Sequence, residues 1–103
     1  MYVNNDFNDE LPWEVDLHIE KLVKDHAHLS SGEILHIQLN FFRDTLDKAI
    51  VNDMSKFYDI HGIGKGRLKV EIHEILVNTK EVKSFNNDYF AKFGFGATEI
   101  VLR

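Results

Sequence analysis

The chain has 103 residues, 44% of them hydrophobic and 28% charged, which suits one globular domain with a modest core. It contains no cysteine, which excludes disulfides, thiolate nucleophiles and cysteine-ligated zinc, and fits a reducing compartment. The formal net charge of −5 argues against a strongly basic, non-specific duplex binder, so contact with a polyanion would need a local basic patch.

Residues 1–12, MYVNNDFNDELP, are mostly polar, and we expect them to form a flexible lead-in to a single domain over residues 13–103. They lack the apolar run of a signal peptide. No segment approaches the length of a membrane span, so we expect a cytoplasmic protein that does not enter membranes.

The alternation of apolar and polar side chains in residues 13–19, WEVDLHI, predicts a strand with one covered face. Asp16 and His18 should then point to the other, uncovered face, near the carboxyl end of this strand. The stretch 20–29 fits either a loop or a short helical turn.

A helix, a strand and a second helix are predicted next. Ser30 and Glu33 have the spacing of a capping box, and apolar residues recur at helical spacing after them, which predicts a long amphipathic helix from about 31 to 52. Residues 56–61, KFYDIH, read as a strand, and an apolar stripe in residues 66–79 predicts the second helix.

Two further strands complete the pattern, over residues 82–90 and 97–103, separated by the glycine-rich turn KFGFG. The order strand–helix–strand–helix–strand–strand favours a two-layer α/β sandwich, with a four-stranded sheet and two helices on one face. Because a long helix joins the first two strands, we expect those strands to be parallel, with a right-handed crossover.

Ionisable side chains gather at the predicted carboxyl edge of the first two strands, where sites form in open α/β sheets. If both strands keep their alternation, Asp16, His18, Asp59 and His61 converge on one uncovered patch. Histidine exchanges protons near neutral pH, so one ring could act as base and the other as acid in phosphodiester cleavage. Asp16 could orient either ring and stabilise its cationic form.

A glycine-rich loop, HGIGKGR, follows the second strand and leads into the second helix. The first amides of a helix attract anions, and glycines let a ligand approach the backbone closely. The candidate phosphate-binding residues are Gly62, Gly64, Lys65, Gly66 and Arg67. Lys69 adds positive charge nearby. The spacing matches neither a Walker loop nor a dinucleotide fingerprint.

Each of these features also has a simpler interpretation. A DxH pair on a strand can be an ordinary surface pair, and glycines mark many turns. His26 and His28 could suggest a metal but fit a solvated loop. His36 and His73 fall on polar helix faces and should be exposed. A divalent metal ion remains an alternative to metal-free acid–base chemistry, with four shared ligands: Asp16, His18, Asp59 and His61.

Together, the motifs resemble those of the Smr (small MutS-related) domain family. That family carries a DLHG-type motif at the end of its first strand and an HGxGxG-type motif after its second strand. It also has a glycine-rich turn before a threonine on its last strand. Here the motifs read DLHI at residues 16–19, HGIGKG at 61–66 and GFGAT at 94–98. The resemblance covers about residues 14–103.

The resemblance implies the fold of the C-terminal domain of translation initiation factor three, a mixed sheet whose final strand is antiparallel to the rest. It also implies a nucleic-acid endonuclease or nicking domain, acting on RNA or DNA within a larger protein. The catalytic positions carried over by motif are Asp16, His18 and His61. Two residues depart from the family pattern, since Ile19 replaces a glycine and Asp59 replaces an apolar residue.

Two other functions remain open. The first is a non-catalytic nucleic-acid or ribosome-binding module that keeps the glycine loop, which Ile19 and the acidic net charge favour. The second is a protein-interaction domain that docks a partner on its open sheet face. A backbone-binding surface could also extend over further cations, namely Lys80, Lys83, Lys92 and Arg103.

Overall fold

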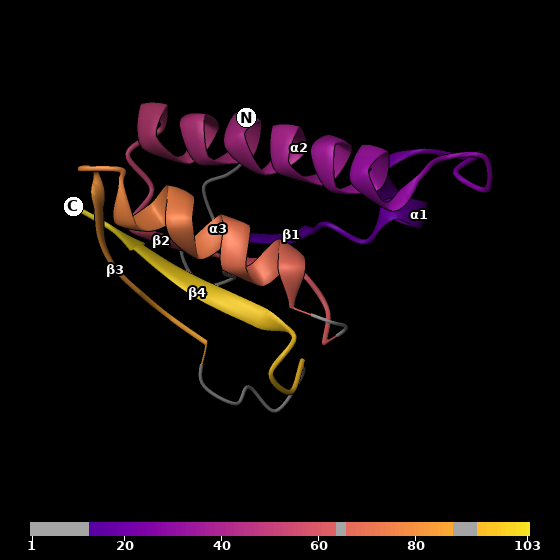
Figure 1. Cartoon of the computed structure of the whole chain (residues 1–103). Helices are drawn as coiled ribbons and strands as arrows, with labels where there is room; N and C mark the ends of the chain where they lie inside the picture. Colours follow the sequence, from indigo (N-terminus) through magenta and orange to yellow (C-terminus); the bar gives the residue numbers. More distant parts are fainter. Residues whose placement is uncertain (1–12, 64–65, 88–92) are drawn as a thin grey trace.

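The computed structural model describes residues 13–63, 66–87 and 93–103 of the chain. The lead-in expected over residues 1–12 lies outside the described residues. Figure 1 shows a single sheet with helices packed over one of its faces. Within the described ranges, no helix combines the length and the apolar character needed to cross a membrane.

The described elements follow the predicted order, with one short helix added. The strands are β1 (Trp13–Asp16), β2 (Lys56–Ile60), β3 (Val82–Asn86) and β4 (Ala97–Leu102). The helices are α1 (Ile19–Leu22), α2 (Ser31–Val51) and α3 (Arg67–Val77). The added helix α1 lies in the stretch that fitted either a loop or a helical turn.

The four strands form one sheet in the order β1-β2-β4-β3. β1 and β2 are parallel, as expected from the crossover through α2, and their register pairs Asp16 with Ile60. β4 is antiparallel to both of its neighbours, β2 and β3. Both long helices, α2 and α3, cover the same face (Figure 1). The predicted α/β class with a mixed four-stranded sheet is therefore confirmed.

The capping box predicted at the start of α2 is present. The amide of Glu33 donates to Ser30 Oγ at 3.1 Å, and the amide of Ser30 donates to Glu33 Oε1 at 2.8 Å. A cap of this kind stabilises a helix by about 1 kcal/mol. From this start α2 runs for 21 residues and buries Leu39, Phe42 and Leu46 against the sheet.

β1 is shorter than the sequence predicts. The strand ends at Asp16, and His18 is the N-cap of α1 rather than a residue of the strand. The cause is local, because Asp16 Oδ1 accepts a hydrogen bond from the amide of His18 at 3.0 Å, which turns the backbone. The amide of Leu17 still donates to the carbonyl of Ile60 at 2.9 Å, so the chain leaves the sheet only after that contact.

Asp59 does not lie on the uncovered face where the sequence analysis placed it. It pairs with Val15 on β1 and with Thr98 on β4, and all three side chains are buried. Asp59 has no exposed surface, and within the described part of the chain its carboxyl oxygens have no hydrogen-bond partner. Burial raises the pKa of the Asp59 carboxyl well above its ordinary value, because the charged form loses its hydration.

Replacing Asp59 with asparagine should increase the free energy of unfolding at neutral pH by about 1–3 kcal/mol, because the side chain keeps its size but carries no charge. When folding raises the pKa of a carboxyl, the free energy of unfolding is highest below the ordinary aspartate pKa. It falls as pH rises from there toward the pKa of the folded state. The gain should therefore be larger at about pH 8 than at about pH 5 in urea denaturation. An equal effect of the substitution at both pH values would contradict a raised pKa for Asp59.

Candidate active site

The carboxyl end of β1 carries a hydrogen-bonded carboxylate and imidazole. Asp16 Oδ1 lies 2.7 Å from His18 Nδ1. An ionised carboxylate only accepts hydrogen bonds, so His18 Nδ1 carries the hydrogen, which leaves a lone pair on Nε2 of the neutral ring. Burial opposes ionisation of Asp16, but the hydrogen bonds from the His18 amide and ring outweigh it and lower the pKa of Asp16. Both side chains are accessible, His18 at 42% and Asp16 at 36% exposure.

Nε2 of His18 faces the start of the glycine loop. A Cβ atom at Gly62 would lie 3.0 Å from this nitrogen. Gly62 has a φ of +86°, and its amide donates to the carbonyl of Gly96 at 2.9 Å. Only glycine combines this backbone conformation with such a close approach to an imidazole. The structure therefore brings together Asp16, His18 and Gly62 at the shared edge of β1 and β2.

His61 lies deeper in the molecule than His18. Its exposure is 9%, and both of its ring nitrogens have partners. Nδ1 lies 2.9 Å from the carbonyl oxygen of Gly62, and Nε2 lies 3.0 Å from Thr98 Oγ1. Burial lowers the pKa of the His61 imidazole; the hydrogen bond to Gly62 opposes this, while cationic neighbours such as Lys69 add to the lowering.

The prediction of an exposed His73 is wrong. This side chain is partly buried, because its Nε2 lies 3.1 Å from Thr98 Oγ1 and its ring packs against Phe85 with centroids 4.9 Å apart. Burial lowers the pKa of His73 as well. The sequence feature that could have indicated burial of His73 is its place next to Ile72, which belongs to the apolar stripe of α3.

A cavity of about 460 Å³ opens beside the loop, between the amino-terminal ends of α2 and α3. Its lining includes Ser31, Gln38, His61, Gly62, Gly66 and Arg67, but neither Asp16 nor His18. From the sequence, only the start of α3 is expected at this place. Gln38 explains why α2 also comes close, since its Nε2 donates to the carbonyl of Leu17 at 2.9 Å and so joins α2 to the end of β1.

The predicted phosphate-binding loop is described in part. Its described residues are Gly62, Gly66 and Arg67, whereas Gly64 and Lys65 lie outside the described ranges. Gly66 is the N-cap of α3 with a φ of +83°. Arg67 is exposed, and its guanidinium Nε lies 3.2 Å from Glu71 Oε2. Lys69 donates a hydrogen bond to Asn87 Oδ1 at 3.1 Å.

The described residues do not supply a suitable set of ligands for the divalent metal ion that was considered as an alternative. Across residues 13–63, 66–87 and 93–103, no three His, Cys, Asp or Glu side chains are grouped so that they could hold a metal ion. Asp59 is buried on the covered face, and His61 already uses both ring nitrogens. The four residues considered from the sequence therefore do not fit a metal ion.

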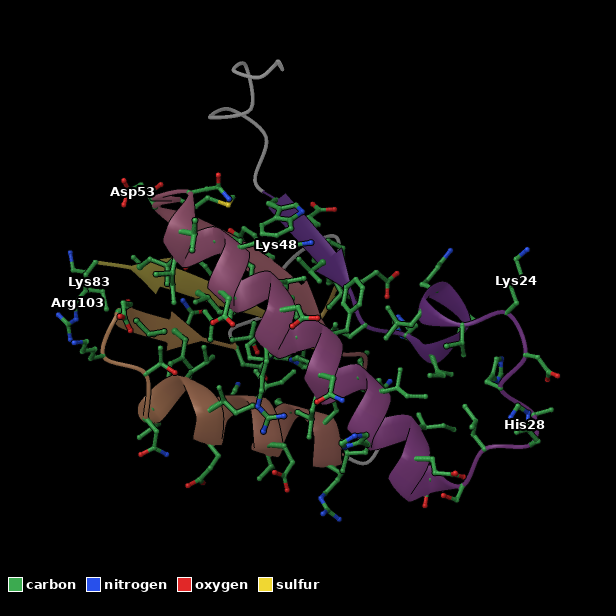
Figure 2. All side chains as sticks on the ribbon, turned by 90° about the horizontal axis from the view of Figure 1, so that it is seen from above. Lys24, His28, Lys48, Asp53, Lys83 and Arg103 are labelled. Carbon is green, nitrogen blue, oxygen red and sulfur yellow. The ribbon has the colours of Figure 1, made fainter. Side chains whose placement is uncertain are left out.

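Two of the cations considered for an extended binding surface lie far from this edge. Figure 2 shows Lys83 and Arg103 at the end of the molecule that also carries Asp53, opposite the loop that carries Lys24 and His28. β4 runs from the glycine-rich turn toward Arg103, so that residue lies at the opposite end of the sheet from the site.

Comparisons with known proteins identify relatives of this chain. A sequence model of the Smr domain matches residues 38–103, which include His61 and Gly62 but neither Asp16 nor His18. The Endonuclease MutS2 of Borreliella burgdorferi is 42% identical over 53 residues. That match covers 52% of this chain and 6% of the relative, so the chain corresponds to a small part of that protein.

Two solved structures share the fold. The Smr domain of Thermus thermophilus MutS2 matches with a TM-score of 0.68 and 28% identity, over 88% of this chain and 98% of that one. YdaL, a stand-alone small MutS-related protein from Escherichia coli, matches with a TM-score of 0.57 and 14% identity, over 87% of this chain and 63% of that one. The second likeness concerns the fold alone. Since the sequence model matches more than half of the chain, this protein belongs to the Smr domain family.

Proposed function

We propose that this Smr domain cleaves phosphodiester bonds in RNA or DNA, with the Asp16–His18 pair transferring the proton. The observation that carries the proposal is the geometry of this pair. Asp16 holds Nδ1 of His18 at 2.7 Å, while Nε2 faces the glycine loop and, among the described residues, has no hydrogen-bond partner. The Borreliella relative is named an endonuclease, which agrees with such an activity.

In the proposed reaction, Nε2 of His18 takes a proton from the attacking oxygen, which is a 2′-hydroxyl of RNA or a water molecule. Asp16 keeps the ring in the required tautomer and stabilises the imidazolium that forms, without accepting the proton itself. The same ring can then return the proton to the leaving oxygen. This proton transfer accounts for about 10²–10⁴-fold of the rate.

His61 has a different role in this proposal from the direct proton exchange considered from the sequence. Its nitrogens are bound to the Gly62 carbonyl and the Thr98 hydroxyl, so it would have to break one of these hydrogen bonds to reach a substrate. We therefore assign His61 to holding the glycine loop in place, and His18 to contact with the substrate.

We place the phosphate in the cavity between the starts of α2 and α3, on the side of Gly62, because Gly62 lines the cavity and a Cβ there would lie 3.0 Å from His18 Nε2, whereas His18 itself does not line it. Backbone amides at the start of α3 and the guanidinium of Arg67 would stabilise charge on the phosphoryl oxygens. Such a local positive site is needed because the net charge of the chain is −5. We also place the domain in the cytoplasm. It would be one module of a larger protein, since the match covers 6% of the MutS2 relative.

Replacing His18 with alanine should lower cleavage by about 10²–10⁴-fold, because the general base is lost. Asp16→Asn should also lower it, because an amide can donate to Nδ1 and favours the wrong tautomer. The assay uses labelled single-stranded RNA and nicked, branched and linear DNA, each with and without chelator.

The control for these variants is His36→Ala. His36 is exposed on α2 and hydrogen-bonds to Asn40, so its loss should leave cleavage at the wild-type rate. Equal cleavage by the wild type and His18→Ala would exclude the proposed base. Salt-sensitive binding of these substrates by a wild-type protein that cleaves none of them would support a binding module instead.

Gly62→Ala and Gly66→Ala form a matched pair, because both glycines have a positive φ, where alanine costs about 1–2 kcal/mol. Both variants should lose stability in denaturation experiments, and Gly62→Ala at least as much as Gly66→Ala. A Cβ at Gly62 would meet His18 Nε2 at 3.0 Å, whereas nothing lies within 4 Å of one at Gly66. NMR signals of the His18 ring should therefore move only in Gly62→Ala. Movement in both variants, or in neither, would contradict the contact.

Arg67→Ala should weaken nucleic-acid binding. It should also reduce the slope of log affinity against log salt concentration by about the amount expected for one phosphate contact. Arg43→Ala is the control, because it removes the same charge from an exposed position on α2 beside a different cavity. Titration of a fluorescent oligonucleotide at several salt concentrations measures both quantities. Identical salt slopes for the two variants would remove Arg67 from the proposed binding surface.

A further inference from the structure

A chain of hydrogen bonds behind the glycine loop joins three elements that are distant in the sequence. Thr98 on β4 is fully buried, and its Oγ1 lies 3.0 Å from Nε2 of His61 and 3.1 Å from Nε2 of His73 on α3. Nδ1 of His61 lies 2.9 Å from the carbonyl oxygen of Gly62. The chain therefore runs from α3 through β4 to the loop after β2.

The chemistry of these groups fixes the direction of the chain. A carbonyl oxygen only accepts, so Nδ1 of His61 carries a hydrogen and donates it to Gly62. A neutral ring then has its lone pair on Nε2, which accepts the hydroxyl hydrogen of Thr98. Thr98 Oγ1 is left to accept from Nε2–H of His73. Burial lowers the pKa of both imidazoles, which favours the neutral rings that this direction requires.

The last hydrogen bond in the chain orients one peptide group of the loop. The carbonyl of Gly62 points toward the His61 ring, and no peptide bond among the described residues is cis. In a trans peptide the carbonyl and the amide point in opposite directions, so the amide of Ile63 points away from that ring. The amide of Gly62 is held separately by Gly96, at 2.9 Å. The backbone that faces His18 is thus fixed on both sides of Gly62.

We propose that His73 and Thr98 are positioning residues, which hold His61 in its Nδ1–H tautomer and thereby fix the Gly62 peptide beside His18. This inference rests on the proposed function in one respect, because it treats the Gly62 loop as part of the active site. The other groups that act on the chain are Lys69, one turn before His73 on α3, His18 on the far side of Gly62, and Phe85, which packs against the His73 ring.

The tautomers can be measured on the whole chain without any substrate, by NMR of ¹⁵N-labelled histidine rings near neutral pH. The expected result is a protonated Nδ1 and an unprotonated Nε2 on His61, together with a protonated Nε2 on His73. The opposite tautomer on His61 would overturn the proposal, because Thr98 could not then donate to that ring.

Two pairs of variants test whether the chain acts at a distance. Thr98→Val removes the hydroxyl at nearly constant size, whereas Thr98→Ser keeps it. His73→Leu removes the donor, whereas His73→Gln keeps an N–H group near the position of Nε2. The amide signals of Gly62 and Ile63 and the ring signals of His18 should move in the first variant of each pair and stay near wild type in the second.

His73 is only partly buried, so its two variants decide the question even if Thr98→Val fails to fold. Unchanged Gly62, Ile63 and His18 signals in folded His73→Leu would overturn the proposal. If the wild type cleaves nucleic acid, His73→Leu should slow cleavage by about 10–100-fold, and His73→Gln should restore most of it. If the wild type cleaves nothing, the NMR experiment still decides this inference, so its failure is separate from that of the nuclease proposal.

Discussion

The parallel pairing of β1 and β2 is the constraint on which the site depends. Their register sets Asp16 beside Ile60, and the amide of Leu17 extends this pairing by one hydrogen bond of 2.9 Å. Because the two strands run in the same direction, the chain leaves the sheet twice at the same edge. His18 follows the first exit and Gly62 the second, although 43 residues lie between them in the sequence. The capped helix α2 spans that separation and makes the parallel arrangement possible.

β4 supports the same edge from the other side. The carbonyl of Gly96 accepts hydrogen bonds from the amides of both His61 and Gly62, each at 2.9 Å. A Cβ at Gly96 would lie 3.3 Å from Cα of Gly62, so the two loops pack backbone against backbone. Thr98 follows two residues later and reaches the His61 ring. The glycine-rich turn before β4 therefore does more than reverse the chain, because it forms the support behind the edge that carries His18 and Gly62.

The sequence predicts those features that depend on local patterns. Helical periodicity placed the end of α2 within one residue, and the order of helices and strands along the chain followed from periodicity, alternation and turns. Alternation in β2 indicates which side chains share a face but not which face the helices cover, because Phe57 and Ile60 are apolar on opposite faces. Asp59 was assigned to the wrong face for this reason. His73 was misplaced because its partner on β4 is 25 residues away and only tertiary packing brings them together.

The position of β1 has a consequence for how the domain would fail on heating. This strand has four residues, lies at the edge of the sheet and pairs with β2 alone within the described sheet. Edge segments of this kind open at a lower free energy than the central strands. Such a subglobal opening would carry Asp16 and His18 away from Gly62 while β2, β4 and both long helices stay packed. The contact between His18 and Gly62 would then be lost before the cooperative melting of the domain.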